Sequence, residues 1–573
     1  MYVTWPTGTA LRVPCGVYKA NPMRLLVATA SMFAFCASVT IAAEFEVGVA
    51  AVDITPRLCH ETTVDKSTAG PSFDVDGDCF RWVHLAGFSP YFPYGKNRIA
   101  EGVHDRLWAR ALAIRGVNDE IVVLVATDLP GLGGKHINPV RRLVQRNFGV
   151  PASHIIVHST HTHSAPDGSG YWSTMLPGRN TPYTDKLRQW VYQSIATALD
   201  GMRPAQMKTV TTTHVSCYNQ RTRELKRDPD CHLPDINNQF NDKLADYDDF
   251  VIQRDQRDPI VRNTRIVAAA FVSLDDGQTI ATLVNWHNHP DTLGSANRLI
   301  SSDYPHYLRE YVEWALGGVS VYFVGTLGNQ IGGLRGTPVP LWDDQHKQVY
   351  EEGVADTHGY PVPVFVQDGW DHIRSTGYGI GHEAVTALAA APLVTSVPVY
   401  VRTRSFETPV DNMIHVLMTW SVWHHDVAPE DRLRYSWPGC WGLLGCVRSN
   451  VSLLRIGELT ILTAPGEIDP AYFLGRRTTV ANYGDQWGMW EFPSMTGVDE
   501  RMPGKHHAVI GSANDYLSYM IPQSDYVGWW NERHPNHYED LVTIGKGFGD
   551  DVTRIWNQLL ETPLGEVPAR PAP

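Results

Sequence analysis

The 573-residue sequence has no excess of positive charge. Its 48 lysines and arginines are outnumbered by 61 acidic residues, and the formal net charge is −13. Because a protein that binds nucleic acid neutralises phosphates with basic side chains, this balance argues against a nucleic-acid partner. With 43% hydrophobic and 19% charged residues, the composition is that of an ordinary globular protein.

Two familiar site signatures are also missing. The glycine-rich run 325–333 lacks the lysine of a phosphate-binding P-loop, which excludes that mode of nucleotide binding. The run 74–78 resembles the start of a calcium loop, but Leu85 stands at the twelfth position, where an EF-hand needs glutamate. The acidic run is therefore predicted to be a solvated turn.

The N-terminal region is predicted to be an export signal. Met23 and Arg24 precede an apolar run, and small residues follow at Ala42 and Ala43, as in a secretory signal peptide. The apolar run is too short for a membrane span. We interpret residues 1–43 as leader and signal peptide, with Met23 as an alternative start, and expect a secreted or periplasmic protein.

Export permits disulfide bonds, and the cysteines are interpreted as such. Six of the eight cysteines follow the signal peptide, and six allow fifteen connectivities. None has zinc-ribbon spacing, and neighbours in sequence are the most economical pairs. The expected disulfides are Cys59–Cys79, Cys217–Cys231 and Cys440–Cys446.

The strongest functional pattern is an apolar strand that leads into histidines. The β-branched run 155–157 is followed by His158, His161 and His163 among hydroxyl residues. On an extended backbone His161 and His163 would point to the same side. Because imidazole binds metals and carries protons, a functional site is favoured over a polar turn.

Two further strands end in a similar way. The strand 279–285 leads to His287 and His289, and the strand 459–463 is followed by Glu467. Ligands from several strand ends are normal in metallohydrolases, so convergence on one ion is one interpretation. The alternatives are unrelated polar strand ends and, for Glu467 taken alone, a solvated loop residue.

Five segments of the sequence form an ordered set of motifs. They are Gly102-Val103-His104, Thr160 to Gly168, Asn285-Trp286 with His289 and Ser302-Asp303, Pro465-Gly466-Glu467 with Gly475-Arg476-Arg477, and Asn514-Asp515-Tyr516-Leu517-Ser518-Tyr519. Together these motifs resemble the neutral, non-lysosomal ceramidases, zinc amidases that cleave the N-acyl bond of ceramide. The resemblance runs from about residue 45 to 560, and Ala165 and Asp167 replace glycines of the family pattern.

The resemblance implies one zinc ion per chain, held by His161, His289, Glu467 and Tyr519. His161 and His163 would be the catalytic histidines, with His163 beside the zinc-activated water as hydrogen-bond partner or proton shuttle. The implied fold is a mixed α/β catalytic domain over residues 44–573, with central sheets flanked by helices and the metal at strand ends. Because the sequence ends soon after residue 560, we expect the family's C-terminal β-sandwich domain to be missing.

The implied activity is hydrolysis of the N-acyl amide bond of a ceramide-like or other N-acylated substrate, either a small molecule or a lipid. One departure opens alternatives: Ile331 stands where the family has a serine assigned as nucleophile. The alternatives are a zinc hydrolase of different bond preference, such as an esterase or peptidase-like enzyme, and a binding protein without turnover. The substrate, the oligomeric state and contact with a membrane surface stay open.

Four residues are expected to contact the substrate. Arg221 approximately matches a substrate-contacting arginine of the family. Gly328 and Asn329 lie in the glycine-rich loop, whose backbone N–H groups would approach a substrate oxyanion. Tyr538 lies in an aromatic loop that would border the substrate entrance, although core packing or surface docking explains that loop equally well.

Overall fold

The computed structural model describes residues 44–59, 75–76, 79–80, 83–88, 98–169, 172, 181–213, 217–219, 224–226, 263–328, 330, 338–355, 359–412, 446–476, 494–526, 539 and 542–562. The predicted leader at 1–43 lies outside these ranges. So do Arg221, Asn329, Ile331 and Tyr538, whose expected roles stay predictions.

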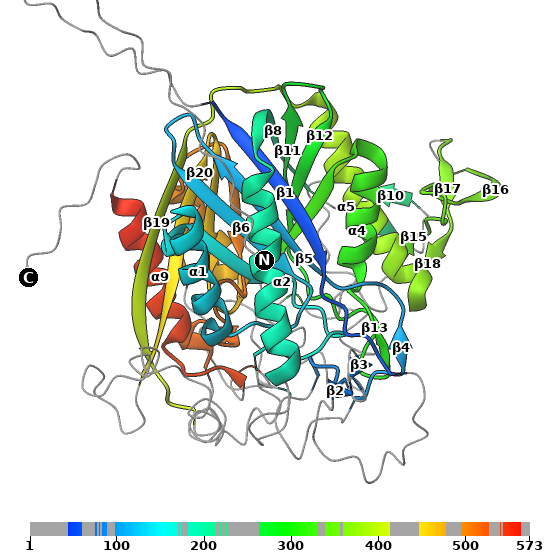
Figure 1. Ribbon diagram of the computed structural model, residues 1–573. Coiled ribbons are helices and arrows are strands. Elements are labelled where there is room, and N and C mark those ends of the chain that lie inside the picture. Colours follow the sequence, from blue (N-terminus) through cyan, green and yellow to red (C-terminus); the bar gives the residue numbers. More distant parts are fainter. Residues whose placement is uncertain are drawn as a thin grey trace, which may run out of the picture. The chain divides into compact units, whose positions relative to one another are not determined.

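An eight-stranded mixed sheet crosses the described part of the chain (Figure 1). The strand order is β14-β12-β11-β8-β1-β5-β6-β7, in which β6–β7 and β12–β14 are parallel and the other pairs are antiparallel. The strands are β1 (Glu46–Asp53), β5 (Trp108–Arg115), β6 (Ile121–Thr127), β7 (Ile155–Ser159), β8 (Arg203–Thr213), β11 (Arg265–Ser273), β12 (Thr279–Trp286) and β14 (Val319–Val324).

A second sheet has four strands in the order β19-β20-β21-β23, of which β21 and β23 are parallel. They are β19 (Val399–Pro409), β20 (Cys446–Ile456), β21 (Leu459–Thr463) and β23 (His506–Ile510). The short strands pair as β2 (Val75–Asp76) with β3 (Cys79–Phe80), β4 (Gly102–Val103) with β13 (Leu299–Ile300), β9 (Cys217–Asn219) with β10 (Glu224–Lys226), β15 (Val339–Pro340) with β18 (Phe365–Val366), β16 (Tyr350–Ala355) with β17 (Pro361–Pro363), and β22 (Glu467–Ile468) with β24 (Tyr519–Met520).

Helices cover the outer faces of both sheets. They are α1 (Gly134–Phe148), α2 (Thr181–Asp200), α4 (Tyr304–Leu316), α5 (Gly369–Ala390), α7 (Pro470–Leu474) and α9 (Phe548–Glu561), with 3₁₀ turns at Ala152–His154, Asp499–Arg501 and Gln523–Asp525. Helix α4 begins after Asp303, whose carboxylate accepts a hydrogen bond from the backbone N–H of Tyr304.

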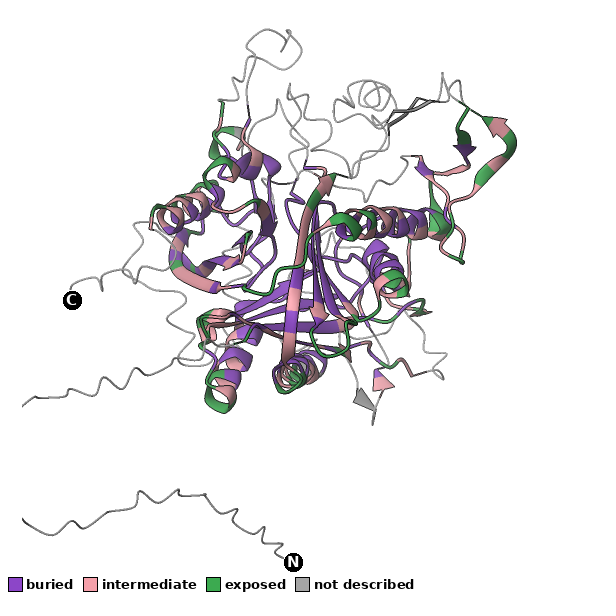
Figure 2. Cartoon of the chain, turned by 90° about the horizontal axis from the view of Figure 1, so that it is seen from above, coloured by how far each residue is buried: buried purple, intermediate pink, exposed green. Residues whose placement is uncertain are grey.

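Alternating side chains place the large sheet between two apolar layers. On β5, Ala111 and Ala113 face α1 and α2, whereas Leu112 and Ile114 face the four-stranded sheet. On β11 the same alternation divides the residues between α4 and α5 on one side and the second sheet on the other. Helix α9 packs on the far side of the second sheet. Figure 2 shows the resulting buried strands between partly exposed helices, so the mixed α/β fold with flanking helices is confirmed.

The disulfide predictions are tested only in part. Cys59 and Cys79 form the expected bond, with a Cα–Cα distance of 5.1 Å, and Cys446 is also disulfide-bonded. Cys231 and Cys440, expected partners in the other two pairs, lie outside the described residues, so those pairings stay predictions.

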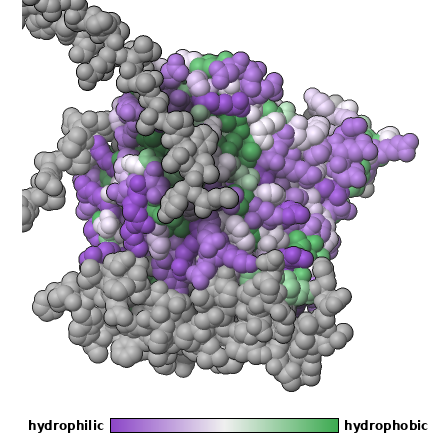
Figure 3. Space-filling view, in the orientation of Figure 1, coloured by the Kyte–Doolittle hydropathy of each residue, from purple (hydrophilic) through white to green (hydrophobic). Residues whose placement is uncertain are grey.

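Within the described ranges, no helix is both long enough and apolar enough to cross a membrane. On the face seen in Figure 3, hydrophilic residues predominate over the projecting hairpin of β16 and β17. Tyr350 and Tyr360 are the exposed aromatic residues of this hairpin and the turn within it. Isolated exposed aromatic side chains of this kind are common on protein surfaces.

Candidate metal centre

Four segments that follow strands bring the predicted site residues together. His161 and His163 follow β7, and His289 follows β12. Glu467 opens β22 after β21, and Tyr519 opens β24, whose parallel register places Tyr519 directly beside Glu467. Residues far apart in the sequence therefore meet because each lies just beyond an apolar strand of one of the two packed sheets.

The polar atoms of these residues converge in a buried cluster. Glu467 Oε2 lies 2.9 Å from His289 Nε2 and 3.5 Å from His161 Nε2. The Nε2 atoms of His161 and His163 are 3.1 Å apart, and the Tyr519 hydroxyl is 3.5 Å from His289 Nε2. All five side chains are buried. A tetrahedron with metal–ligand bonds of about 2.0–2.1 Å has an edge of roughly 3.3 Å, so these separations suit ligands of one ion.

Hydrogen bonds outside the cluster determine which nitrogen of each histidine faces inward. His161 Nδ1 lies 2.5 Å from the carbonyl oxygen of Pro130, and His289 Nδ1 lies 3.2 Å from that of Gln330. A carbonyl oxygen only accepts, so each Nδ1 carries the proton and donates it. Both Nε2 lone pairs therefore face Glu467, which is the arrangement that metal-binding histidines adopt.

This arrangement leaves electron pairs facing each other unless a cation lies between them. A neutral His289 Nε2 and the Glu467 carboxylate are both acceptors at 2.9 Å. Burial alone raises the pKa of Glu467, but His161 and His289 outweigh burial and hold that pKa well below its usual range. Burial lowers the pKa of His289, and Glu467 outweighs it and raises that pKa. The cluster therefore favours one positive charge at its centre, either a proton or a metal ion.

His163 makes the ligand set ambiguous. The ligand atoms of His161, His163 and His289 lie within 4.8 Å of one another, so three imidazoles could also hold an ion. Burial, followed by the charges of His161 and His289, lowers the pKa of His163 well below its usual value. His163 is thus a neutral imidazole at neutral pH, suited either to bind a metal or to accept a proton.

The segments 83–88 and 98–100 hold His163 in place. A Cβ atom on Gly87, whose φ is +105°, would lie 2.3 Å from His163 Cγ, so only glycine allows this approach. The Phe88 ring packs edge to face on the His163 imidazole, with the ring centroids 4.7 Å apart. The Arg98 guanidinium donates a 2.8 Å hydrogen bond to the His163 carbonyl oxygen. Sequence reasoning missed these three residues because they lie in no recognisable motif.

The extended backbone expected at 161–163 is wrong. His161 has a φ of +67°, and β7 has already ended at Ser159. The two rings converge because the chain turns after the strand, not because residues alternate along it. The preceding histidines have structural roles instead: His158 Nδ1 lies 2.7 Å from the Gly511 carbonyl, and His287 Nδ1 accepts from the N–H of Thr326.

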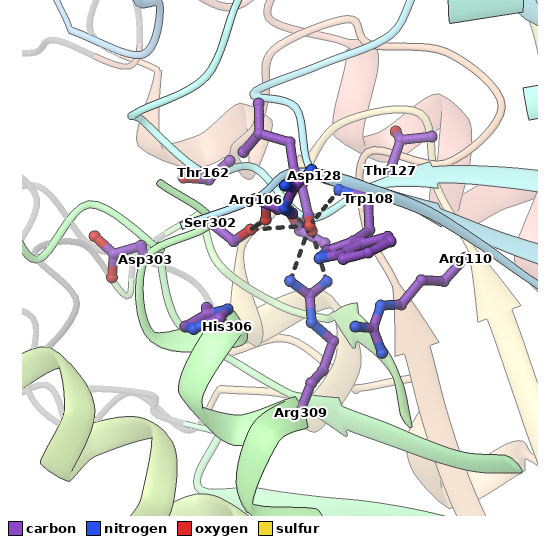
Figure 4. A network of polar contacts seen from close by, with 12 residues as sticks. Arg106, Trp108, Arg110, Thr127, Asp128, Thr162, Ser302, Asp303, His306 and Arg309 are labelled. Atoms are coloured by element: carbon purple, nitrogen blue, oxygen red, sulfur yellow. Dashed lines mark hydrogen bonds and ion pairs between the residues drawn. The ribbon is translucent and has the colours of Figure 1, made fainter. Parts of the chain in front are cut away.

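A buried network of charged and polar residues holds the loop that carries His161 (Figure 4). The Arg309 guanidinium donates to both carboxylate oxygens of Asp128 at 2.7 and 2.8 Å. The same carboxylate accepts from the backbone N–H of Trp108 and from Ser302 Oγ, both at 2.9 Å, and from Thr160 Oγ1 at 3.3 Å. Thr160 immediately precedes His161, so the network ties the histidine loop to α4.

The expected substrate role of Gly328 does not fit its backbone contacts. The Gly328 N–H donates a 2.9 Å hydrogen bond to the carbonyl of Ile468, beside Glu467. That donor is already used within the fold, so it is not available to a substrate oxyanion. Gly328 instead joins the loop after β14 to the segment that carries Glu467.

The fold and the cluster define a mixed α/β protein with buried nitrogen and oxygen ligands that could hold a metal ion. Residues 72–322 match the sequence model of the family described as neutral/alkaline non-lysosomal ceramidase, N-terminal. The chain is a relative of the neutral ceramidase family, which confirms the resemblance seen in the sequence.

Two solved structures share the fold. Neutral ceramidase from Pseudomonas aeruginosa is 16% identical, with a TM-score of 0.53, over 90% of this chain and 74% of the other. A ceramidase complexed with C2 is 17% identical, with a TM-score of 0.52, over 92% of this chain and 77% of the other. A comparison with curated proteins found no significant match. At these identities the structures establish the fold, and the family match supplies the class of hydrolase.

Proposed function

We propose that the chain is a zinc-dependent amidohydrolase that cleaves the N-acyl amide bond of a ceramide-like or other N-acylated substrate. The observation that carries this proposal is the contact at 2.9 Å between His289 Nε2 and Glu467 Oε2. The His289 proton is used at Nδ1, so two buried acceptors face each other, and a divalent cation relieves their repulsion. The relation to neutral ceramidases supplies the bond class.

His161, His289, Glu467 and Tyr519 would hold the zinc ion. Two imidazoles, a carboxylate and a phenolic oxygen are nitrogen and oxygen donors of the kind that zinc accepts. When bound, zinc supplies a Lewis acid that polarises a carbonyl and lowers the pKa of water. The Nδ1 contacts of the two histidines hold their rings with Nε2 toward Glu467, as zinc binding would require.

His163 would move the proton. Its Nε2 lies beside the cluster, and its imidazole is neutral because burial lowers its pKa. A neutral Nε2 accepts the proton of the attacking water and then delivers it to the amide nitrogen as the carbon–nitrogen bond breaks. Gly87, Phe88 and Arg98 fix the ring for this transfer.

We assign the attack on the substrate carbonyl to water because of Ile331. Its side chain has no nucleophilic atom, and it occupies the position where the family resemblance places a serine. The same residue favours a second candidate, a protein that binds metal and an N-acylated ligand without turnover. A zinc hydrolase that prefers an ester or a peptide bond is the third candidate.

One assay separates these candidates. Purified protein is incubated with a fluorescent N-acyl-sphingosine and, in parallel, with an ester of the same acyl chain, before and after chelation and after addition of zinc. The proposal predicts amide cleavage that chelator abolishes and zinc restores. Preferential ester cleavage would indicate the hydrolase of different bond preference, and zinc binding without cleavage of either compound would contradict the proposed amidase.

We also propose that the chain is exported, because residues 23–43 have the pattern of a secretory signal. Intact-mass and N-terminal analysis of protein recovered from the cell exterior or periplasm would show a mature chain that begins near residue 44. Recovery of the protein only from the cytoplasm, with residues 23–43 still attached, would contradict export without affecting the proposed chemistry.

A further inference from the structure

Tyr516 contacts Glu467, one of the expected metal ligands, and neither the sequence nor the family comparison gave this tyrosine a role. Its hydroxyl lies 2.5 Å from Glu467 Oε1. A carboxylate only accepts, so the phenol donates this hydrogen bond. The other carboxylate oxygen, Oε2, is the one that faces His161 and His289. The hydroxyl therefore donates to Oε1, the carboxylate oxygen that does not face His161 and His289.

The ring of Tyr516 also contacts the imidazole of His161. Their centroids are 5.6 Å apart with an interplanar angle of 27°. A Cβ atom on Gly131 would lie 2.6 Å from Tyr516 Cγ, so glycine is needed for the ring to fit. The residue before it, Pro130, accepts the hydrogen bond from His161 Nδ1. One side chain thus touches two of the expected ligands.

The backbone around Tyr516 is held by its own contacts. The Asp515 carboxylate accepts from the N–H of Gly134 at 2.9 Å and from Ser449 Oγ at 3.1 Å. Asn514 and Ser518 have φ values of +68° and +67°, so the chain turns tightly on both sides of the tyrosine. The same segment continues to Tyr519 in β24, which makes the position of Tyr516 part of the construction of the site.

We propose that Tyr516 is a positioning residue that keeps Glu467 a one-oxygen ligand and holds the ring of His161 in its ligating orientation. The proposal rests on the metal site proposed above. A carboxylate bound through both oxygens would take up a coordination position that a catalytic zinc site keeps open for water or substrate. A hydrogen bond from a neighbouring residue to a metal ligand orients that ligand and increases metal affinity.

The test is Tyr516→Phe, which removes the hydroxyl and keeps the ring. Its matched control is Tyr183→Phe, because Tyr183 is also buried and its hydroxyl donates to a carbonyl, that of Ile54, at 3.0 Å. Zinc affinity is measured by competition with a chromophoric chelator. We expect a loss of about 10–100-fold in Tyr516→Phe, the usual size for a lost outer contact, and no change in Tyr183→Phe.

A second readout excludes a merely structural role. The cobalt-substituted protein is examined by visible absorption, and we expect Tyr516→Phe to change the band positions or intensities while Tyr183→Phe leaves them as in the wild type. The unfolding temperatures of the two metal-free variants should fall by similar amounts. Unchanged zinc affinity together with an unchanged cobalt spectrum in Tyr516→Phe would overturn the role of Tyr516.

Two outcomes must be distinguished from each other. Failure of the wild-type protein to bind zinc would remove the proposed metal site itself, whereas normal zinc binding in Tyr516→Phe would remove only the role of Tyr516. If that variant does not fold, the infrared difference spectrum of the wild type on zinc binding decides. A wide splitting of the carboxylate stretches supports coordination by one oxygen, and a narrow splitting contradicts it.

Discussion

Replacement of Arg309 by methionine should strongly destabilise the fold. Arg309 and Asp128 are almost fully buried and share two hydrogen bonds of 2.7 and 2.8 Å. Methionine preserves much of the apolar stem but removes the guanidinium. The hydrogen bonds that remain on the Asp128 carboxylate then come from uncharged groups, the backbone N–H of Trp108 and the hydroxyls of Ser302 and Thr160. The charge of Arg110 still acts on Asp128.

The expected loss follows from these contacts. Two hydrogen bonds to a charged group at about 1.5–3 kcal/mol each give about 3–6 kcal/mol. Removal of one partner of a buried ion pair costs about 3–5 kcal/mol, because the other charge is left without compensation. The three remaining donors on Asp128 favour the lower part of that range, so we expect a decrease of about 3–4 kcal/mol in the free energy of unfolding.

The assay is denaturant unfolding of the metal-free protein followed by tryptophan fluorescence, for Arg309→Met, Asp128→Asn and the double variant. Metal is removed so that zinc binding does not contribute to the measured stability. Because each single variant leaves a buried charge unpaired, the double variant should lose less than the sum of the two single losses. A loss below about 1 kcal/mol in Arg309→Met, or strictly additive losses, would refute this account of the network.

Three further predictions concern the metal cluster and the pH dependence of stability. His161→Ala and His289→Ala should each lose zinc, because removal of one of four ligands opens the site, and full zinc occupancy by elemental analysis in either variant would contradict the ligand set. His163→Ala should keep zinc but hydrolyse substrate on the order of a hundredfold more slowly, the usual size for a lost acid or base; loss of zinc would make His163 a ligand, and full activity would exclude its proton transfer. The pair Asp499 and His507, 2.9 Å apart, should stabilise the protein over a limited pH range. Burial raises the pKa of Asp499, but hydrogen bonds from His507 and a neighbouring arginine lower it to about 2, so the contribution of Asp499 is present above its unfolded pKa and is lost as the pH falls toward 2. The hydrogen bond with Asp499 raises the pKa of His507, so its contribution is complete below the unfolded pKa of about 6.5 and is lost as the pH rises through the raised value. His507→Gln should therefore reduce the unfolding temperature at pH 6 and leave it nearly unchanged at pH 9, and an equal loss at both pH values would exclude the ion pair.

Much of the fold was predictable because its strands are apolar and bounded by turn residues. The strand 155–159, the helix that Asp303 caps and the hairpin near Gly277 all follow from local sequence. The pairing of strands was not predictable, because β1 lies between β5 and β8, both distant in sequence. Local sequence patterns do not indicate which strands distant in sequence will pair.

Some residues of the candidate site were likewise predictable from the sequence, and others were not. His161, His163 and His289 stand out because histidines follow apolar strands. The sequence around Glu467 indicates a metal ligand only weakly, and Tyr519 is predicted to be a ligand from the family resemblance alone. Tyr516 lies in the same N-x-Y-x-x-Y segment, but its contact with Glu467 depends on a turn with positive φ values and on the space at Gly131. Contacts that depend on such three-dimensional geometry cannot be predicted from a sequence pattern.

The most direct test of the proposed metal centre is the zinc content of the purified wild-type protein after exhaustive dialysis and after reconstitution. We predict one zinc ion per chain, bound tightly enough to survive dialysis and removed by a strong chelator. A protein that stays free of zinc and of other divalent metals after reconstitution would show that the charge between His289 and Glu467 is a proton, and the metal centre would be contradicted.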